Sequence, residues 1–237
     1  MKMKRVYSFL LFVFMFALFA NIIEVNAMNT GFSTEELTKE KQNTFVSNVS
    51  ISLLTVEPVK KAILCFDVNE KGMIAIGQKG AYNKEICIYS ADGKFLYGYT
   101  FNCSQSFGVE WDNEHINIYF VRSDVIISLD SDGNILDIKE VQNTIDNNTY
   151  RNNLLYSTSR VVDDTTYVIR NDMGLFNWIT TSYSKIITID PAGVECIIYD
   201  VSSTQYINTM TLFFVLMFVS VTVAIVIWQF VKLKRCN

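Results

Sequence analysis

The middle of the chain alternates short apolar segments with polar turns. Three stretches show this most clearly, with the sequences IYSADGKFLYGY at residues 88–99, ISLDSDGNILDI at 127–138 and ITIDPAGVECII at 187–198. Apolar and polar side chains that alternate with a period of two predict half-buried β-strands, and a turn that contains glycine predicts a hairpin between them. From Phe45 onward the chain is therefore predicted to be all-β.

The three turns carry a glycine at the same place. Gly93, Gly133 and Gly193 each follow an isoleucine by seven residues and a serine or aspartate by three. The serine or aspartate side chain can accept hydrogen bonds from backbone amides, and glycine adopts the positive φ that other residues resist. We therefore predict that these glycines are the turn residues of equivalent hairpins.

Each of these hairpins follows another hairpin, so the repeating unit is expected to be four antiparallel strands. The units cover about residues 62–101, 108–141 and 158–201. The first two glycines lie 40 residues apart and the third lies 60 residues further on. The excess falls in two segments, residues 142–159 and 171–184, which are predicted to be loops.

A four-stranded unit of about 40 residues is the period of a β-propeller blade. Residues 62–201 resemble the blades of NHL-type and related β-propellers, in which strand pairs recur around an Asp-x-x-Gly turn. The resemblance implies a partial β-propeller of antiparallel four-stranded blades, about three in number. It carries no active-site residue to this chain, because no residue of a known propeller active site is matched. A generic antiparallel meander or sandwich is the alternative.

Three blades are too few for a closed propeller, which uses about four to eight. Segments such as residues 125–129 are apolar on both sides, which indicates that both faces of a blade are buried. The two outer faces of a three-blade stack would then be open, at roughly 300 Å² each, where an exposed apolar patch implies a partner. We expect pairing with a second copy, as a homo-oligomer, or with a different propeller fragment.

The C-terminal apolar segment, residues 209–231, contains no charged residue. A helix of this length spans roughly 34 Å, enough to cross a hydrocarbon core of about 30 Å. Aromatic residues lie near both ends and basic residues follow, which predicts a transmembrane helix with residues 232–237 in the cytoplasm. These membrane-flanking residues are Tyr206, Trp228, Lys232, Lys234 and Arg235.

At the other end, residues 1–27 have a basic start, an apolar stretch and a small-residue site, which predicts a signal peptide. An uncleaved signal anchor is the alternative. Both place residues 28–61, a lead-in segment with one candidate strand, and residues 62–205, the β-propeller-like domain, outside the cytoplasm. The predicted location is the plasma membrane, with a single span.

Within the lead-in, Ser33 and Glu36 have the spacing of a capping box, which favours a short helix there. A mobile lead-in is the alternative. Residues 45–56 are the candidate strand.

Charge limits the partners. Residues 28–205 contain 14 basic and 23 acidic residues, a formal charge of −9. No basic patch suits a phosphate backbone, so no nucleic acid is expected. The expected partners are the lipid bilayer and a protein.

Catalytic chemistry is not indicated. The single histidine, His115, lies in a polar turn region without a serine or cysteine motif. Residues 130–137 are acidic but lack the spacing of a calcium loop, so a hairpin turn is predicted there. We expect no catalytic residue, no metal and no cofactor, and predict that the protein is not an enzyme.

Two further features stay open at this point. Phe176 and Trp178 lie outside the strand pattern, and they form a candidate recognition loop, a small satellite core or a contact with the bilayer. An even number of cysteines permits three disulfide pairings, with buried free thiols as the alternative. These residues are Cys65, Cys87, Cys103 and Cys196.

The function expected from the sequence is a membrane-anchored extracytoplasmic module for binding or assembly. The alternative is an accessory or sensor subunit of a membrane complex, in which Ser220, Thr222 and Ala224 would allow close helix contact. An extracellular hydrolase is a distant third, because no nucleophile–base pair or metal constellation is visible.

Overall fold

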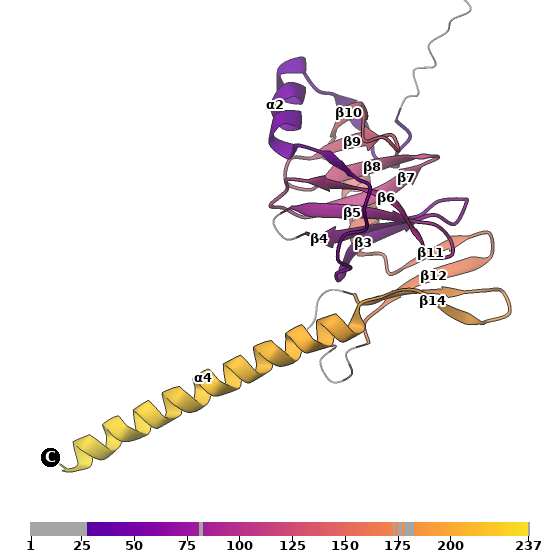
Figure 1. Cartoon of the computed structure of the whole chain (residues 1–237). Helices are drawn as coiled ribbons and strands as arrows, with labels where there is room; N and C mark the ends of the chain where they lie inside the picture. The colour runs from indigo at the N-terminus through magenta and orange to yellow at the C-terminus, as the bar shows by residue number, and fades with distance from the viewer. Residues whose placement is uncertain (1–27, 81–82, 173, 175–176, 178–182, 237) are drawn as a thin grey trace, which may run out of the picture.

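The computed structural model describes residues 28–80, 83–172, 174, 177 and 183–236. Over these residues the chain forms three antiparallel sheets, two short helices and a long C-terminal helix (Figure 1). The prediction of a mainly β chain that ends in an apolar helix is confirmed. The three sheets do not close into a ring.

Each sheet contains four consecutive strands joined as a meander. The first sheet has the order β2-β6-β5-β4-β3, with β2 (Ser52–Leu54), β3 (Ile63–Val68), β4 (Ile74–Lys79), β5 (Lys84–Tyr89) and β6 (Phe95–Phe101). The second has the order β1-β10-β9-β8-β7, with β1 (Thr34–Glu36), β7 (Phe107–Asp112), β8 (His115–Phe120), β9 (Val125–Leu129) and β10 (Ile135–Val141). The third has the order β11-β12-β13-β14, with β11 (Ser159–Val162), β12 (Thr165–Arg170), β13 (Lys185–Ile189) and β14 (Glu195–Asp200).

The segment before the first meander adds an edge strand to two sheets. β1 pairs with β10 of the second sheet, and β2 pairs with β6 of the first. Between them lies α2 (Lys39–Val49), whose N-cap is Thr38. The predicted helix start at Ser33 is therefore wrong, because pairing with β10 satisfies the backbone of the following residues as a strand. The predicted strand at residues 45–56 is shorter, since its first residues belong to α2.

Residues 142–159, predicted to be a loop, contain a second correction. They form α3 (Ile145–Tyr156), and the side chain of Thr144 caps it by accepting a hydrogen bond from the Asn147 N–H at 3.1 Å. Leu154 is the apolar residue of this helix that is buried. One buried apolar side chain leaves no helical period in the sequence, which is why this helix is not visible there.

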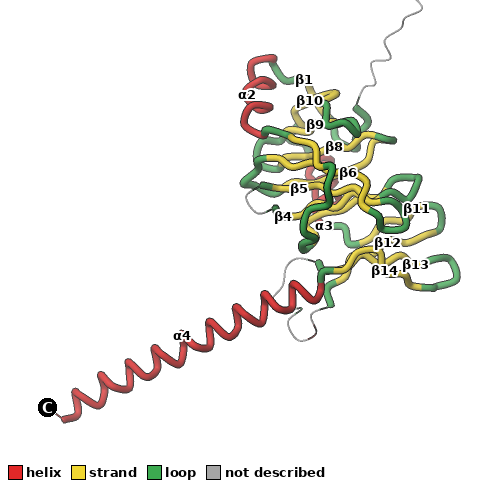
Figure 2. The backbone as a smooth tube through the Cα atoms, in the orientation of Figure 1, coloured by secondary structure: helices red, strands yellow, loops and turns green. Residues whose placement is uncertain are grey.

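The three sheets are stacked as layers, with the first sheet between the other two (Figure 2). Its strand β3 shows how both faces are used. Cys65 packs in the core shared with the second sheet, and the adjacent Phe66 packs in the core shared with the third. Both faces of the middle sheet are therefore buried, and the buried apolar area holds the three layers together.

The three turn glycines have left-handed backbone conformations. The φ angles are 78° at Gly93, 84° at Gly133 and 81° at Gly193. In the second of these turns, Asp130 Oδ1 accepts hydrogen bonds from the backbone N–H of Asp132 at 3.0 Å and of Asn134 at 2.8 Å. Residues 130–137 are thus a turn and the start of β10, as expected for a hairpin.

The last helix, α4 (Ser202–Cys236), follows β14 with only Val201 between them. It is long and apolar enough over Ser202–Trp228 to cross a membrane, and its apolar surface is not buried by the rest of the described chain. Figure 2 shows α4 leaving the third sheet and extending away from the three layers. Residues 1–27, the predicted signal peptide, lie outside the described residues.

Candidate functional site at the meeting of the three sheets

The first strands of the three meanders, β3, β7 and β11, meet at one side chain. Asp67 Oδ2 on β3 accepts a hydrogen bond from the backbone N–H of Trp111 on β7 at 2.8 Å. Asp67 Oδ1 accepts one from Nε of Arg160 on β11 at 2.7 Å. Arg160 also lies over the ring of Phe66, at 5.4 Å from its centroid. One carboxylate therefore joins all three sheets.

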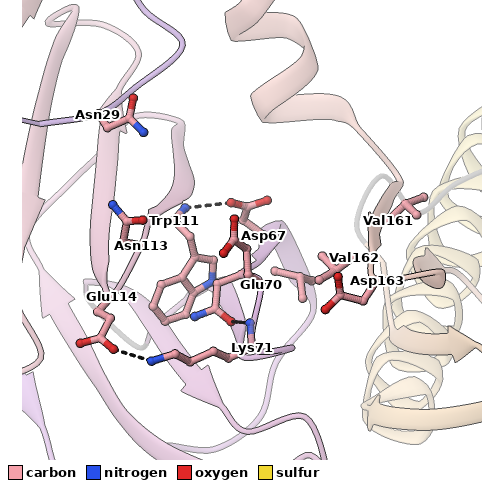
Figure 3. Close-up of a pocket in the computed structure, with 12 residues that line it drawn as sticks. Asn29, Asp67, Glu70, Lys71, Trp111, Asn113, Glu114, Val161, Val162 and Asp163 are labelled. Atoms are coloured by element: carbon pink, nitrogen blue, oxygen red, sulfur yellow. Dashed lines mark hydrogen bonds and ion pairs between the residues drawn. The ribbon is translucent and has the colours of Figure 1, made fainter.

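A cleft of about 760 Å³ opens beside this carboxylate. Its rim consists of the first turn of each meander, represented by Glu70 and Lys71, by Asn113 and Glu114, and by Asp163 (Figure 3). Its walls include Asp67, Trp111, Val161 and Val162. We call this space the inner-strand cleft. Its volume lies within the ~300–1,000 Å³ range of small-molecule and peptide sites.

The rim turns depend on residue types that tolerate the left-handed region. Asn113 has φ 55°, and Asp163 and Asp164 have φ 45° and 63°. Asn and Asp enter this region more readily than other residues that carry a side chain, so the first turns of the second and third meanders form without glycine, whereas that of the first meander uses Gly72 at φ 73°. These turns hold Asn113 and Asp163 on the rim at the cleft mouth.

The cleft carries an excess of negative charge. Four carboxylates line it, those of Asp67, Glu70, Glu114 and Asp163, against one lysine, Lys71. Lys71 forms an ion pair with Glu114, and this hydrogen bond lowers the pKa of Glu114 (Figure 3). Asp67 is paired with Arg160. Among the described residues, Glu70 and Asp163 have no cationic partner.

Trp111 forms an aromatic wall of the cleft. Its backbone is fixed by the bond to Asp67, as Figure 3 shows. Its indole Nε1 is buried and has no hydrogen-bond partner within the described chain. Buried polar groups of this kind are rare in folded proteins and are found more often at functional sites.

A smaller cavity of about 240 Å³ is also lined by Asp67, together with Arg160. Its main polar group is Glu110 on β7, which is 5% exposed. Glu110 accepts hydrogen bonds from the Tyr150 hydroxyl at 2.5 Å and from Asn117 Nδ2 at 3.2 Å. Burial raises the pKa of Glu110, and the hydrogen bonds from Thr30, Tyr150 and Asn117 oppose this rise. The cavity thus belongs to the contact between α3 and β7.

No metal site is found in the part of the chain that the structure describes, because no three His, Cys, Asp or Glu side chains are grouped to hold an ion. Cys65, Cys87, Cys103 and Cys196 are free thiols. Burial raises the pKa of Cys65 and Cys87 to about 12, so neither forms a thiolate near neutral pH.

Those residues selected from the sequence whose side chains the structure describes do not line the inner-strand cleft. Phe176 and Trp178 lie outside the described residues. Gly93, Gly133 and Gly193 lie in the second turn of each meander, whereas the cleft is formed by the first turns. The membrane-flanking residues lie in α4, where Tyr206 is 44% and Trp228 64% exposed, and where the backbone continues through Lys232, Lys234 and Arg235.

Sequence reasoning missed the cleft residues, although one signal was present. Trp111 lies two residues before the first turn of the second unit, and the first turn of each unit contains at least one acidic residue. A comparison with protein-family models finds no match, and a comparison with curated proteins finds none either.

Proposed function

We propose that this protein is a membrane-anchored module for binding and assembly, and that the outer face of its third sheet is completed by a second copy of the chain. The observation that carries this proposal is the unequal cover of the two outer faces of the stack. The sequence predicted that both outer faces of the stack are open. This is wrong, because the outer face of the second sheet is covered.

The outer face of the second sheet is covered by the chain itself. Tyr119, Ile126 and Val141 of this sheet are buried together with Met28 and Phe32 from the segment before β1. Leu154 of α3 joins the same cluster. This face therefore needs no partner.

The third sheet ends the stack on the other side, and in Figure 1 the described element that continues beyond it is α4, which extends away from the sheet. Its inner residues, such as Tyr167 and Tyr199, are buried against the first sheet. The residues that point the other way include Val168, Ile187 and Ile197, which are neighbours across β12, β13 and β14. Ile197 is 54% exposed, and Val161 on β11 is 70% exposed. This outer face therefore holds exposed apolar residues, while Ile187 is only 7% exposed and the charged residues Arg170, Lys185, Glu195 and Asp200 share the face.

A second copy fits this face because of how the helix is attached. In the proposed topology α4 spans the bilayer, the β domain lies outside, and the basic residues after Trp228 stay in the cytoplasm. α4 follows β14 directly, so the third sheet lies close to the membrane. Two chains in one bilayer share the same direction, and a two-fold axis along the membrane normal can bring two identical faces together.

The partial β-propeller remains part of this proposal. Three layered meanders whose first strands meet near Asp67 have the arrangement expected of neighbouring blades, with first strands innermost. Two chains that pair through their third sheets would form an open stack of six such units, because the covered second sheets leave no face for closure.

The test is co-purification of two differently tagged copies from membranes solubilised in mild detergent. Ile197→Glu replaces an exposed apolar residue of this face by a charge and is expected to reduce recovery of the second tag by at least about tenfold. Leu136→Glu is the matched control, because Leu136 is a 46% exposed strand residue of the second sheet, and it should leave recovery unchanged. Equal recovery in both variants, or a monomeric wild-type chain, would contradict pairing through the third sheet.

The accessory or sensor subunit is the second candidate, and α4 favours it. The hydroxyls of Ser220 and Thr222 donate to carbonyls one turn earlier in α4. These side chains are therefore satisfied within the helix and leave small surfaces for another span. Recovery of a distinct membrane subunit in place of a second copy would support this function.

A further inference from the structure

We propose that the inner-strand cleft binds an organic cation that has an apolar stem, such as the side chain of an arginine or lysine in a partner segment. Val161 belongs to both the cleft and the outer face of the third sheet, but the contacts proposed here are made by Glu70, Asp163 and Trp111, so this inference does not depend on pairing between copies. It rests on the position of the cleft, on its uncompensated charges and on its aromatic wall.

The cleft opens at the end of the third sheet that lies away from the membrane helix. Asp163 lies in the turn before β12. Arg170, at the other end of β12, pairs with Lys185, which in turn pairs with Asp200 just before the start of α4. A strand of this length spans about 20 Å. The mouth of the cleft is therefore accessible from outside when α4 is in a membrane.

The charges available to a ligand are those that the protein leaves unpaired. Arg160 is engaged by Asp67 on the wall, and Lys71 is engaged by Glu114 on the rim. Glu70 and Asp163 come from turns of two different sheets and line the same space. A cation held between them would gain charge-assisted hydrogen bonds from both sides.

The wall next to these carboxylates is apolar. Trp111 and Val162 line the cleft together with Glu70 and Asp163 (Figure 3). An indole ring attracts a guanidinium or ammonium group placed over its face and packs well against a methylene stem. A simple metal ion lacks such a stem, so Trp111 distinguishes an organic cation from an inorganic one.

The experiment is calorimetric titration of the full chain in nanodiscs with three probes. The first is a blocked Gly-Arg-Gly peptide, the second is the same peptide with citrulline in place of arginine, and the third is spermidine. The arginine peptide is expected to bind at least about tenfold more tightly than the citrulline peptide, because citrulline has the same length but lacks the positive charge and two of the N–H donors. The affinity of spermidine relative to that of the arginine peptide shows whether the bound cation comes from a free polyamine or from a peptide side chain.

Paired variants locate the binding. Glu70→Gln with Asp163→Asn removes both unpaired charges, and asparagine retains the left-handed turn at position 163. This variant is expected to weaken binding of the arginine peptide by about tenfold or more. Glu35→Gln with Asp132→Asn removes two exposed charges elsewhere and should change binding by less than about twofold.

Trp111→Phe retains an aromatic wall and should weaken binding only partly, whereas Trp111→Ala should weaken it further. Absence of binding, equal affinity for the two peptides, or equal loss in the cleft and control variants would overturn the proposal. Competition by millimolar Mg²⁺ as strong as that by spermidine would do the same.

Discussion

At the residue scale, Asp67 shows which contacts a sequence can and cannot reveal. Its two partners lie 44 and 93 residues away in the chain, and nothing in the segment CFDV marks it as more than a polar strand residue. The turn glycines are different, because their positive φ is a local requirement that leaves a local signature. Turns were therefore predictable from the sequence, and the centre of the molecule was not.

Asp67→Ala tests how much this carboxylate contributes to stability. The substitution leaves Arg160, whose side chain is 20% exposed, without its counter-ion, and it removes the acceptor of the Trp111 N–H. We expect the free energy of unfolding to fall by about 2–4 kcal/mol. Chemical denaturation of the full chain in detergent measures this change. Asp132→Ala, at an exposed turn position, is the control, and an equal effect of both substitutions would contradict a central role for Asp67.

At the element scale, the short helices were the main errors of sequence reasoning. α3 has polar side chains on most of its surface and is held by Leu154 and by a polar contact, Tyr150 with Glu110. The bounds of α2 were not predicted, because its second half contains the aromatic and β-branched residues Phe45, Val46 and Val49, which favour a strand. The long strands were predictable because their alternation is repeated three times, and a single short helix has no such repetition.

The contact between α3 and β7 should make stability depend on pH. Burial raises the pKa of Glu110 above its ordinary value of 4.5, so the folded state holds this proton more tightly than the unfolded state. The contribution of the group is therefore fully present below pH 4.5 and is lost as the pH rises through the folded pKa.

Glu110→Gln removes this titration while keeping the shape of the side chain. The unfolding free energy of the variant relative to wild type is expected to increase between pH 4.5 and 7.5. Thermal unfolding at the two pH values measures the difference, with Glu35→Gln as an exposed control that should show no such trend. A difference that is independent of pH would mean that Glu110 titrates as an ordinary exposed carboxylate.

At the scale of the whole molecule, the three four-stranded units were predictable from the sequence. Which segments cover the outer faces of the stack was not. The units of four strands follow from turn spacing alone. The cap over the second sheet depends on residues 28–33 and on α3, which contact that sheet from segments that carry no strand pattern. This difference between the two outer faces leaves the third sheet, which α4 follows directly, as the face proposed for a second chain.

The direct junction between β14 and α4 should matter for that pairing. Because only Val201 separates the sheet from the helix, two spans in one bilayer hold the two outer faces at a fixed orientation and a high effective concentration. A flexible insertion of about twelve glycine and serine residues after Val201 lets each domain rotate over a wider volume. Recovery of a second tagged copy is expected to fall several-fold, while the thermal stability of each domain stays the same. The control is the same insertion after Arg235, which lengthens the chain beyond the span and leaves the sheet attached as before. If both insertions gave wild-type recovery, the spans would not orient the faces, and any pairing would come from the third sheet alone.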